Sequence, residues 1–179
     1  MTTSTNPRTV FPAPPAGKDL RFVPLFLGIF LALHFLYTLG RGGEVERVVL
    51  DVLTVQPAVA LINFITPSEQ VVAQGHRLVS PQAALSVLGG CEGIEGILLL
   101  VAALSAFRLA WQDRLLGMAI GTAFIYALNL LRIMGLYYVF RYQRDWFDIA
   151  HAYVGSTVII LLGCLFFLFW ANRSMARAE

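Results

Sequence analysis

The run LLGMAIGTAFIYALNLLRIMGLYYVF, from Leu115 to Phe140, is the longest apolar stretch of the chain and contains one charge, Arg132. A helix needs about 20 mostly apolar residues to cross the hydrocarbon core of a bilayer. This run is therefore long enough to cross a membrane as one helix. Because a guanidinium that faces lipid is costly, we expect Arg132 to face a polar cavity or a partner within the protein.

Three further runs are apolar over a comparable length: Phe22 to Leu39, Glu92 to Phe107, and Ile149 to Trp170. The composition agrees with them, since 58% of the residues are hydrophobic and 13% are charged, whereas soluble domains average about 45–50% and about 25%. The sequence therefore predicts an all-α integral membrane protein with four transmembrane helices. The net charge of +2 is too small to indicate a nucleic-acid partner.

A fifth apolar segment, from Val48 to Thr66, is ambiguous because it contains Asp51, Gln56 and Pro57. Four spans with both termini inside leave seven basic residues on the inside and five on the outside, whereas a fifth span leaves six on each side. Since cytoplasmic loops are usually the more basic ones, this count favours four spans. It predicts that Val48–Thr66 is an interfacial or re-entrant helix of the outer leaflet. A fifth span is the alternative, and it would move the site described below to the cytoplasmic side.

The proposed spans divide the chain into three parts. Residues 1–21 form a tail, residues 22–171 form a single membrane domain, and residues 172–179 form a second tail. The first tail is rich in proline and cannot bury enough apolar surface to fold, so we expect it to be disordered. Both tails are expected to lie in the cytoplasm.

The polar segment from Pro67 to Gly90 is expected to form a small extracytoplasmic loop. Within it, residues 71–79 have the pattern of a short hairpin that turns near Gly75. Residues 84–88 have the pattern of a strand that leads back toward the second span.

The segment LGGCEGIEG, at residues 88–96, places one thiol and two carboxylates at the mouth of the second span. The thiol is that of Cys91, and the carboxylates are those of Glu92 and Glu95. A helix N-terminus and a nearby cation both lower the pKa of a thiol, and Arg132 could supply that cation. The two carboxylates act in the opposite direction unless they are paired.

Arg132 and His151 are predicted to lie at the same depth as Cys91. Arg132 is seventeen residues beyond Leu115, which corresponds to about 25 Å along a helix that starts at the inner face. His151 stands at the outer start of the fourth span. Three side chains that are far apart in sequence are therefore expected to meet at one level of the membrane.

Two polar residues are spaced to support this group. Asn129 precedes Arg132 by about one helical turn and shares its face. Asp148 precedes His151 by one turn, where a carboxylate can fix the tautomer of an imidazole and raise its basicity.

Three short motifs follow one another along the chain: CEGI at residues 91–94, NLLRI at residues 129–133, and His151 with Gly155 four residues later. In these motifs the sequence resembles the exosortase/archaeosortase family of polytopic membrane proteins. Its short length resembles the compact exosortase H type. Glu92 stands where many members of the family have a small residue.

The resemblance implies a sortase-like cysteine transpeptidase with Cys91, Arg132 and His151 as its catalytic residues. Cys91 would be the nucleophile and His151 the proton carrier, while Arg132 would stabilise the oxyanion or position the substrate carbonyl. Supporting roles would fall to Asn129, Asp148, Glu92 and Glu95. The resemblance implies neither a cofactor nor a metal.

The resemblance also implies a class of partner and a location. Substrates would be exported proteins with a C-terminal sorting signal, made of a short motif, a transmembrane helix and a basic tail. For the compact type the motif resembles Ile-Pro-Thr-Leu. The acyl group would pass to an amine acceptor, which can be lipid-linked. The protein would lie in the bacterial inner membrane, with its site at the outer face.

The residues alone leave other interpretations open. A metal-dependent intramembrane protease could use Glu92, Glu95 and His151, although such sites normally contain more ligands. A thiol oxidoreductase would need a second cysteine beside Cys91, and Cys164 lies deep in the fourth span. A non-enzymatic assembly or binding protein is the remaining alternative, in which each of these side chains could be replaced without loss.

Overall fold

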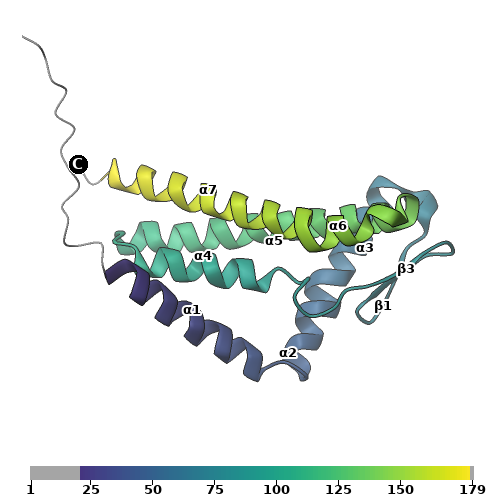
Figure 1. Cartoon of the computed structure of the whole chain (residues 1–179), viewed down its shortest axis with the longest axis horizontal. Coiled ribbons are helices and arrows are strands. Elements are labelled where there is room, and N and C mark those ends of the chain that lie inside the picture. Colours follow the sequence, from purple (N-terminus) through teal and green to yellow (C-terminus); the bar gives the residue numbers. More distant parts are fainter. Residues whose placement is uncertain (1–20, 178–179) are drawn as a thin grey trace, which may run out of the picture.

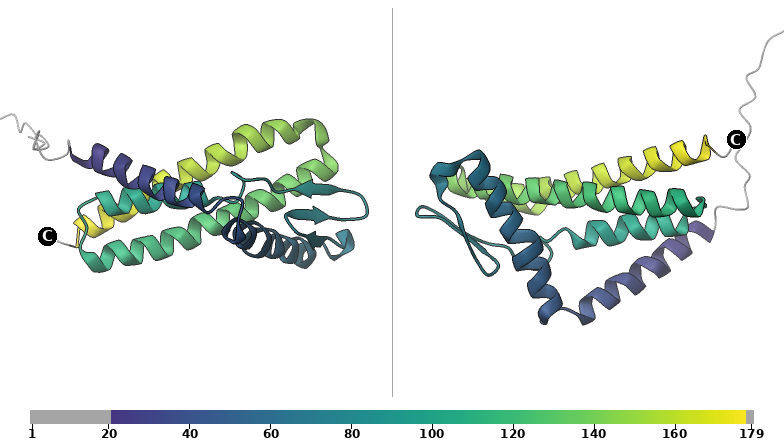
Figure 2. Two further views of the ribbon diagram at one scale, coloured as in Figure 1. Left: turned by 90° about the horizontal axis from the view of Figure 1, so that it is seen from below. Right: turned by 180° about the vertical axis from the view of Figure 1, so that it is seen from behind.

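The computed structural model describes residues 21–177, and within them four helices run back and forth along the long axis of the molecule (Figure 1). These helices are α1 (Phe22–Leu39), α4 (Ile94–Ala106), α5 (Trp111–Tyr142) and α7 (Gly155–Met175). The start of α1, the connection between α4 and α5, and the end of α7 lie together at one end of the molecule (Figures 1 and 2). We call this the terminal end, and we call the opposite end the loop end.

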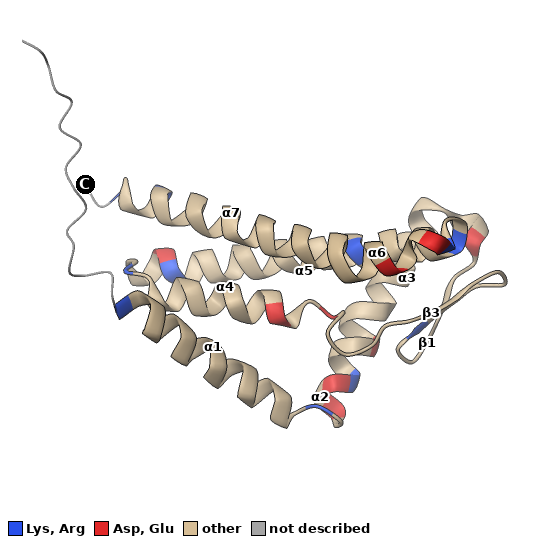
Figure 3. Ribbon diagram, in the orientation of Figure 1, with Lys and Arg blue, Asp and Glu red and all other residues tan. Residues whose placement is uncertain are grey.

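Hydropathy identifies the chain as a multi-pass membrane protein. Within residues 21–177, four helices are long and apolar enough to cross a membrane: Phe22–Leu39, Glu44–Ile65, Trp111–Tyr142 and Arg144–Met175. Charged residues are sparse along the middle of α1 and α7 (Figure 3). The predicted all-α membrane fold is therefore confirmed.

The predicted span of residues 92–107 is present as α4, but this helix has 13 residues and begins at Ile94. Gly93, the residue before it, has a φ of +79°. This value lies in the left-handed region, so the helix cannot extend back through Gly93. Thirteen residues correspond to about 20 Å of helix, which is shorter than a hydrocarbon core of about 30 Å. The helix of the second predicted span is therefore shorter than expected and begins two residues later, at Ile94.

The segment Glu44–Ile65 is an unbroken run of helix that crosses the loop end steeply instead of running along the bundle (Figure 2). It consists of α2 (Glu44–Arg47), a π-helical stretch η2 (Val48–Val55) and α3 (Gln56–Ile65). Pro57 is the second residue of α3, and the carbonyl four residues earlier, with which a proline ring clashes in an α-helix, belongs to the π-helical stretch. The length of Glu44–Ile65 allows it to span a membrane, whereas its orientation favours an interfacial helix. The interfacial or re-entrant assignment therefore stays a prediction.

The loop that follows contains a three-stranded antiparallel sheet in the order β1 (Val72–Gln74), β2 (Arg77–Val79) and β3 (Ala84–Ser86). The hairpin turns at Gly75, whose φ is +57°, as its sequence predicts. The predicted strand at residues 84–88 is β3, which ends at Ser86. Leu78 pairs with Leu85 in the register, and both are buried, so the sheet packs one face onto the helices.

A short 3-10 helix, η3 (Pro67–Glu69), ties this loop to the outer part of α5. The buried carboxylate of Glu69 accepts hydrogen bonds from the hydroxyls of Tyr137 and Tyr142, and Arg141 lies 3.6 Å from it. The two tyrosine hydroxyls, together with the Arg141 charge, hold the pKa of the Glu69 carboxyl below its usual value. This ionised contact fixes the position of the sheet relative to α5.

Buried apolar side chains form two clusters, one toward each end. The loop-end cluster joins α3, the sheet and α5 through Val55, Ile62, Leu78, Ile133 and Tyr137, among others. The terminal-end cluster joins α4, α5 and α7 through Leu100, Leu104, Ile125, Ile159 and Trp170. Cys91 packs against the loop-end cluster.

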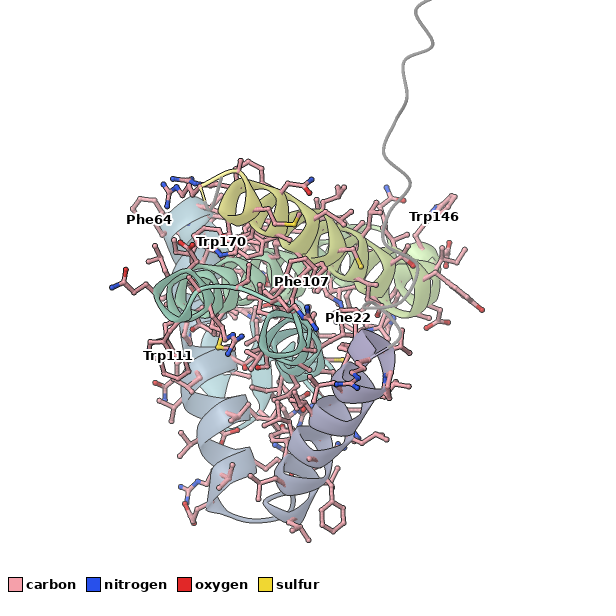
Figure 4. The ribbon with its side chains drawn as sticks, turned by 90° about the vertical axis from the view of Figure 1, so that its left-hand side faces the viewer. Phe22, Phe64, Phe107, Trp111, Trp146 and Trp170 are labelled. Carbon is pink, nitrogen blue, oxygen red and sulfur yellow. The ribbon has the colours of Figure 1, made fainter. Side chains whose placement is uncertain are left out.

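Aromatic side chains also mark the periphery. Figure 4 views the molecule from the terminal end, with Phe64, Trp111 and Trp146 at its edge. All three are exposed, which is the position that aromatic residues prefer near a membrane interface.

The C-terminal limit of the membrane domain was predicted at residue 171. Helix α7 continues beyond residue 171 and ends at Met175. Most of the predicted N-terminal tail, residues 1–20, lies outside the described residues.

Candidate active site

Cys91 lies in a turn between β3 and α4 that two left-handed glycines shape. Gly90 has a φ of +97° and Gly93 a φ of +79°, values that residues with a side chain rarely adopt. A Cβ atom at Gly93 would lie 2.6 Å from Cγ of Asn129. Asn129 therefore occupies the space that the missing side chain leaves, and α5 approaches the turn closely.

Asn129 also binds the turn directly. Its side chain is 1% exposed, and its Nδ2 donates a hydrogen bond to the Cys91 carbonyl at 3.1 Å. The amide thus fixes the backbone of the residue that carries the thiol, as expected for a supporting residue. Its Oδ1 is buried and has no partner among the described residues.

His151 faces Cys91 across the site. The Cys91 Sγ atom lies 3.8 Å from Nε2 and 4.0 Å from Nδ1 of the ring, so neither nitrogen is singled out as its partner. The ring stacks on Phe147, with centroids 5.5 Å apart. His151 belongs to a π-helical stretch, η5 (Ala150–Val154), and such widened turns often occur at functional sites.

Arg132 reaches the same place from α5. Its Nη2 donates to the His151 carbonyl at 3.3 Å and to the Ser156 hydroxyl at 3.2 Å. A Cβ atom at Gly155 would lie 2.5 Å from Nε of Arg132, so the glycine leaves the space that the guanidinium stem fills. The structure therefore brings Cys91, Arg132 and His151 together, while their catalytic roles stay a prediction.

The supporting carboxylates behave differently from one another. Glu92 is 5% exposed and accepts hydrogen bonds from the Tyr37 hydroxyl at 2.8 Å and from the Gly90 N–H. Glu95 and Asp148 are exposed. The His151 ring contacts Phe147 and Cys91 in the described structure, and no hydrogen bond joins it to Asp148 there.

The model of the transmembrane exosortase family (Exosortase_EpsH) matches residues 15–170. The chain belongs to this family. The match includes the Cys91 turn, Arg132 on α5 and His151 before α7, and the subtype, predicted as the compact H type, stays a prediction. No curated protein matches the chain, and no solved structure does so.

The surroundings of the Cys91 thiol favour its neutral form. Burial, as the largest effect, raises the pKa of Cys91, and the charge of Glu92 raises it further. The charge of Arg132 lowers it, but by less than burial raises it. The expectation of a lowered pKa is therefore wrong for the resting state, because Cys91 lies in a buried turn before α4 and not in the first turn of the helix.

Cys91 and His151 both line a small pocket of about 20 Å³, which has room for about one water molecule. Its apolar wall comes from the sheet, from α5 and from the segment before α7, through Leu85, Val87, Ile133, Leu136 and Phe147. Cys91 itself is half-buried.

A larger groove, of about 400 Å³, lies between α5 and α7. Its lining is apolar except for Arg132, and Gly135 and Gly155 lie along it. Leu131 and Val154 on its rim are exposed.

Within residues 21–177, no three His, Cys, Asp or Glu side chains lie close enough to hold one metal ion. Cys91 and Cys164 are both free thiols. Cys164 lies on the wall of a separate apolar cavity between α1, α4 and α7.

Three residues that contact the site were missed in the sequence. Phe147 precedes His151 by four residues, and this spacing could have indicated the stack. Ser156 directly follows Gly155, but its contact depends on how α7 crosses α5. Tyr37 is 55 residues from Glu92, and no local pattern indicates such a partner.

Proposed function

We propose that this exosortase is a sortase-like cysteine transpeptidase that cleaves C-terminal sorting signals of exported proteins and transfers them to an amine acceptor. The observation that carries the proposal is the approach of the Cys91 thiol to within 3.8 Å of the His151 ring. Arg132 is bonded to the backbone of that histidine. A nucleophile, a base within reach and a fixed cation are the parts that acyl transfer through a thioester requires.

In the first half of the reaction, the His151 ring accepts the thiol proton as Sγ of Cys91 attacks the carbonyl carbon of the scissile peptide bond. The C–S bond forms, and the carbonyl electron pair moves onto the oxygen. When the tetrahedral intermediate collapses, the C–N bond breaks and His151 gives its proton to the leaving amine. The exported protein remains as a thioester on Cys91.

In the second half, an amine acceptor attacks the thioester carbonyl while His151 accepts a proton from the amine. A new C–N bond forms, and the C–S bond breaks. The proton on His151 then returns to the thiolate. Cys91 and His151 thus recover their starting states, and the reaction exchanges one amide for another.

Arg132 is proposed to stabilise the oxyanion. Of the three guanidinium nitrogens of Arg132, only Nη2 donates hydrogen bonds to described residues. The Nε atom is buried and has no partner among them. The guanidinium therefore keeps donors available for the negative charge that develops on the substrate oxygen. Loss of one such donor typically lowers the rate by about 10²–10³.

We propose that the groove between α5 and α7 receives the transmembrane helix of the sorting signal. Arg132 lies on the wall of this groove and also contacts His151, so an occupant of the groove reaches the catalytic group directly. Glycines along a groove allow the backbones of two helices to approach closely. An apolar helix followed by a basic tail would then place the preceding motif at Cys91.

The proposed location is the bacterial inner membrane, with the loop end outside and the terminal end in the cytoplasm. The excess of basic residues on the terminal side supports this orientation. The sorting signal of an exported protein would then meet Cys91 after export.

Co-expression with an exported protein that carries such a sorting signal tests the proposal. Replacing Cys91 by alanine should abolish cleavage, whereas Cys164→Ala, which removes the other cysteine, should leave it unchanged. Gel mobility of the substrate reports the result. Cleavage at the wild-type rate by Cys91→Ala would refute the proposed chemistry.

A further inference from the structure

Glu92 and Arg132 carry opposite charges beside the same thiol, yet they are not paired with each other. Both charges act on the pKa of Cys91, in opposite directions. Within residues 21–177 the ion pairs involve other residues. Opposite charges attract more strongly where the surroundings exclude water, and each of these two groups is bonded to neutral partners.

The Glu92 carboxylate is held by neutral donors on both of its oxygens. The Tyr37 hydroxyl donates to Oε1 at 2.8 Å, and the Gly90 N–H donates to Oε2. Because Glu92 is 5% exposed, its oxygens depend on these donors in place of water. Tyr37 is part of α1, which brings its hydroxyl to the turn from outside the group of catalytic residues.

The Arg132 guanidinium is held by neutral acceptors. Its Nη2 donates to the His151 carbonyl and to the Ser156 hydroxyl. No carboxylate of the described chain forms an ion pair with it. Its charge is therefore available for an oxyanion, provided that Glu92 does not turn toward it.

We propose that Tyr37 is a positioning residue that holds the Glu92 carboxylate away from Arg132 and thereby keeps the guanidinium free for substrate. The inference rests on the proposed function, in which Arg132 faces a developing oxyanion. Without the Tyr37 hydroxyl, Oε1 of Glu92 would lose its donor, and Arg132 is a cation beside the same thiol. An ion pair between the two would satisfy Glu92 and occupy the guanidinium.

A double-mutant cycle tests this role, with cleavage of a co-expressed sorting-signal substrate as the readout. Loss of one oxyanion donor typically lowers the rate by about 10²–10³, so partial capture of Arg132 by Glu92 in Tyr37→Phe should slow cleavage by about tenfold or more. Adding Glu92→Gln removes the charge that would capture Arg132. The double variant should therefore recover to within about threefold of Glu92→Gln alone.

Tyr126→Phe is the matched control. The Tyr126 hydroxyl donates to the Leu53 carbonyl at 2.7 Å, a tertiary hydrogen bond of α5 that does not involve Cys91, Glu92 or Arg132. This variant should cleave at the wild-type rate. A thiol probe at neutral pH gives a second readout. Cys91 should react faster in the variants that carry Glu92→Gln than in those that keep Glu92, because the charge of Glu92 raises the pKa of the thiol.

Two results would overturn the inference: a wild-type rate for Tyr37→Phe, or a double variant no faster than Tyr37→Phe. The second result would mean that Tyr37 acts through packing alone. Cys91→Ala belongs in the same series and keeps the two proposals separate. If it still cleaves, the proposed function fails, whereas a Cys91-dependent cleavage without rescue removes only the role of Tyr37.

Discussion

Arg132 occupies the space that a side chain at position 155 would fill. A Cβ at Gly155 would lie 2.5 Å from Nε of Arg132 and 3.0 Å from its Cγ and Cδ. The glycine that follows His151 is therefore tied to the position of the guanidinium, and through it to the carbonyl of His151.

Gly155→Ala should slow cleavage by roughly tenfold or more, because the new methyl group displaces Arg132 from its contacts and from the oxyanion. Gly28→Ala on α1 is the matched control, since nothing lies within 4 Å of a Cβ built at Gly28 and Gly28 is not among the groove residues. Cleavage assays and thermal unfolding of both variants check the prediction. Equal rates for the two variants would show that the position of Arg132 does not depend on Gly155.

The titration of Cys91 should depend on Arg132. The Arg132 charge lowers the pKa of the thiol, although burial leaves it raised overall. Arg132→Ala should therefore raise this pKa further, which reduces the thiolate fraction at neutral pH and slows alkylation. Labelling rates measured from about pH 6 to about pH 10 on a Cys164→Ala background give the midpoint. A midpoint that stays the same or falls would contradict the arrangement described here.

The sequence predicted that Cys91, Arg132 and His151 meet, because the lengths of apolar helices fix depth in a membrane. It did not predict the resting pKa of the thiol. The pKa of the thiol depends on how deeply the sheet and α5 bury it. The spacing of residues in the sequence does not reveal such side-chain contacts. For the same reason Asp148, well spaced for His151, is exposed, while Phe147 forms the contact.

At the scale of elements, α5 and α7 form the groove whose wall includes Arg132, and each helix contributes a glycine to it. Helix α5 also provides Asn129 to the Cys91 turn. One long helix thus connects the groove, the thiol and the proposed oxyanion site.

Gly135→Leu should fill the groove and slow cleavage, since open space surrounds a Cβ at this position and the larger side chain would project into the path of a substrate helix. Gly28→Leu on α1 is the control, because a Cβ there is also free of neighbours and Gly28 is not among the groove residues. Both variants should keep their thermal stability in detergent. Unchanged cleavage by Gly135→Leu would place the substrate helix elsewhere.

The helices themselves were largely predictable, since uninterrupted apolar runs define them. The start of α4 was not, because it depends on the left-handed Gly93 and on the close approach of Asn129. The direction of Glu44–Ile65 was left open by its composition, since Asp51 and Pro57 suit an interfacial helix while its length also suits a span.

At the scale of the whole molecule, the described chain begins and ends at the terminal end, and the segment that joins β3 to α4 lies toward the loop end (Figure 1). This arrangement requires an even number of crossings if the terminal end stays on one side of the membrane. Helices α1, α4, α5 and α7 provide those crossings when Glu44–Ile65 lies across the loop end.

Reporter fusions test this topology. A fluorescent protein after Met175 should fold in the cytoplasm, and alkaline phosphatase inserted at the Gly75 turn should be active outside. Phosphatase that is inactive at Gly75 would instead support a fifth span, with the Cys91 site on the cytoplasmic side.

The most direct test of the account is a search for the acyl-enzyme. Purified exosortase incubated with a sorting-signal substrate, without an amine acceptor, should accumulate a thioester on the peptide that contains Cys91, and mass spectrometry should detect it. Hydroxylamine should remove the adduct, and His151→Ala should form it much more slowly. Cleavage that proceeds with no adduct on Cys91, and continues in Cys91→Ala, would contradict the account.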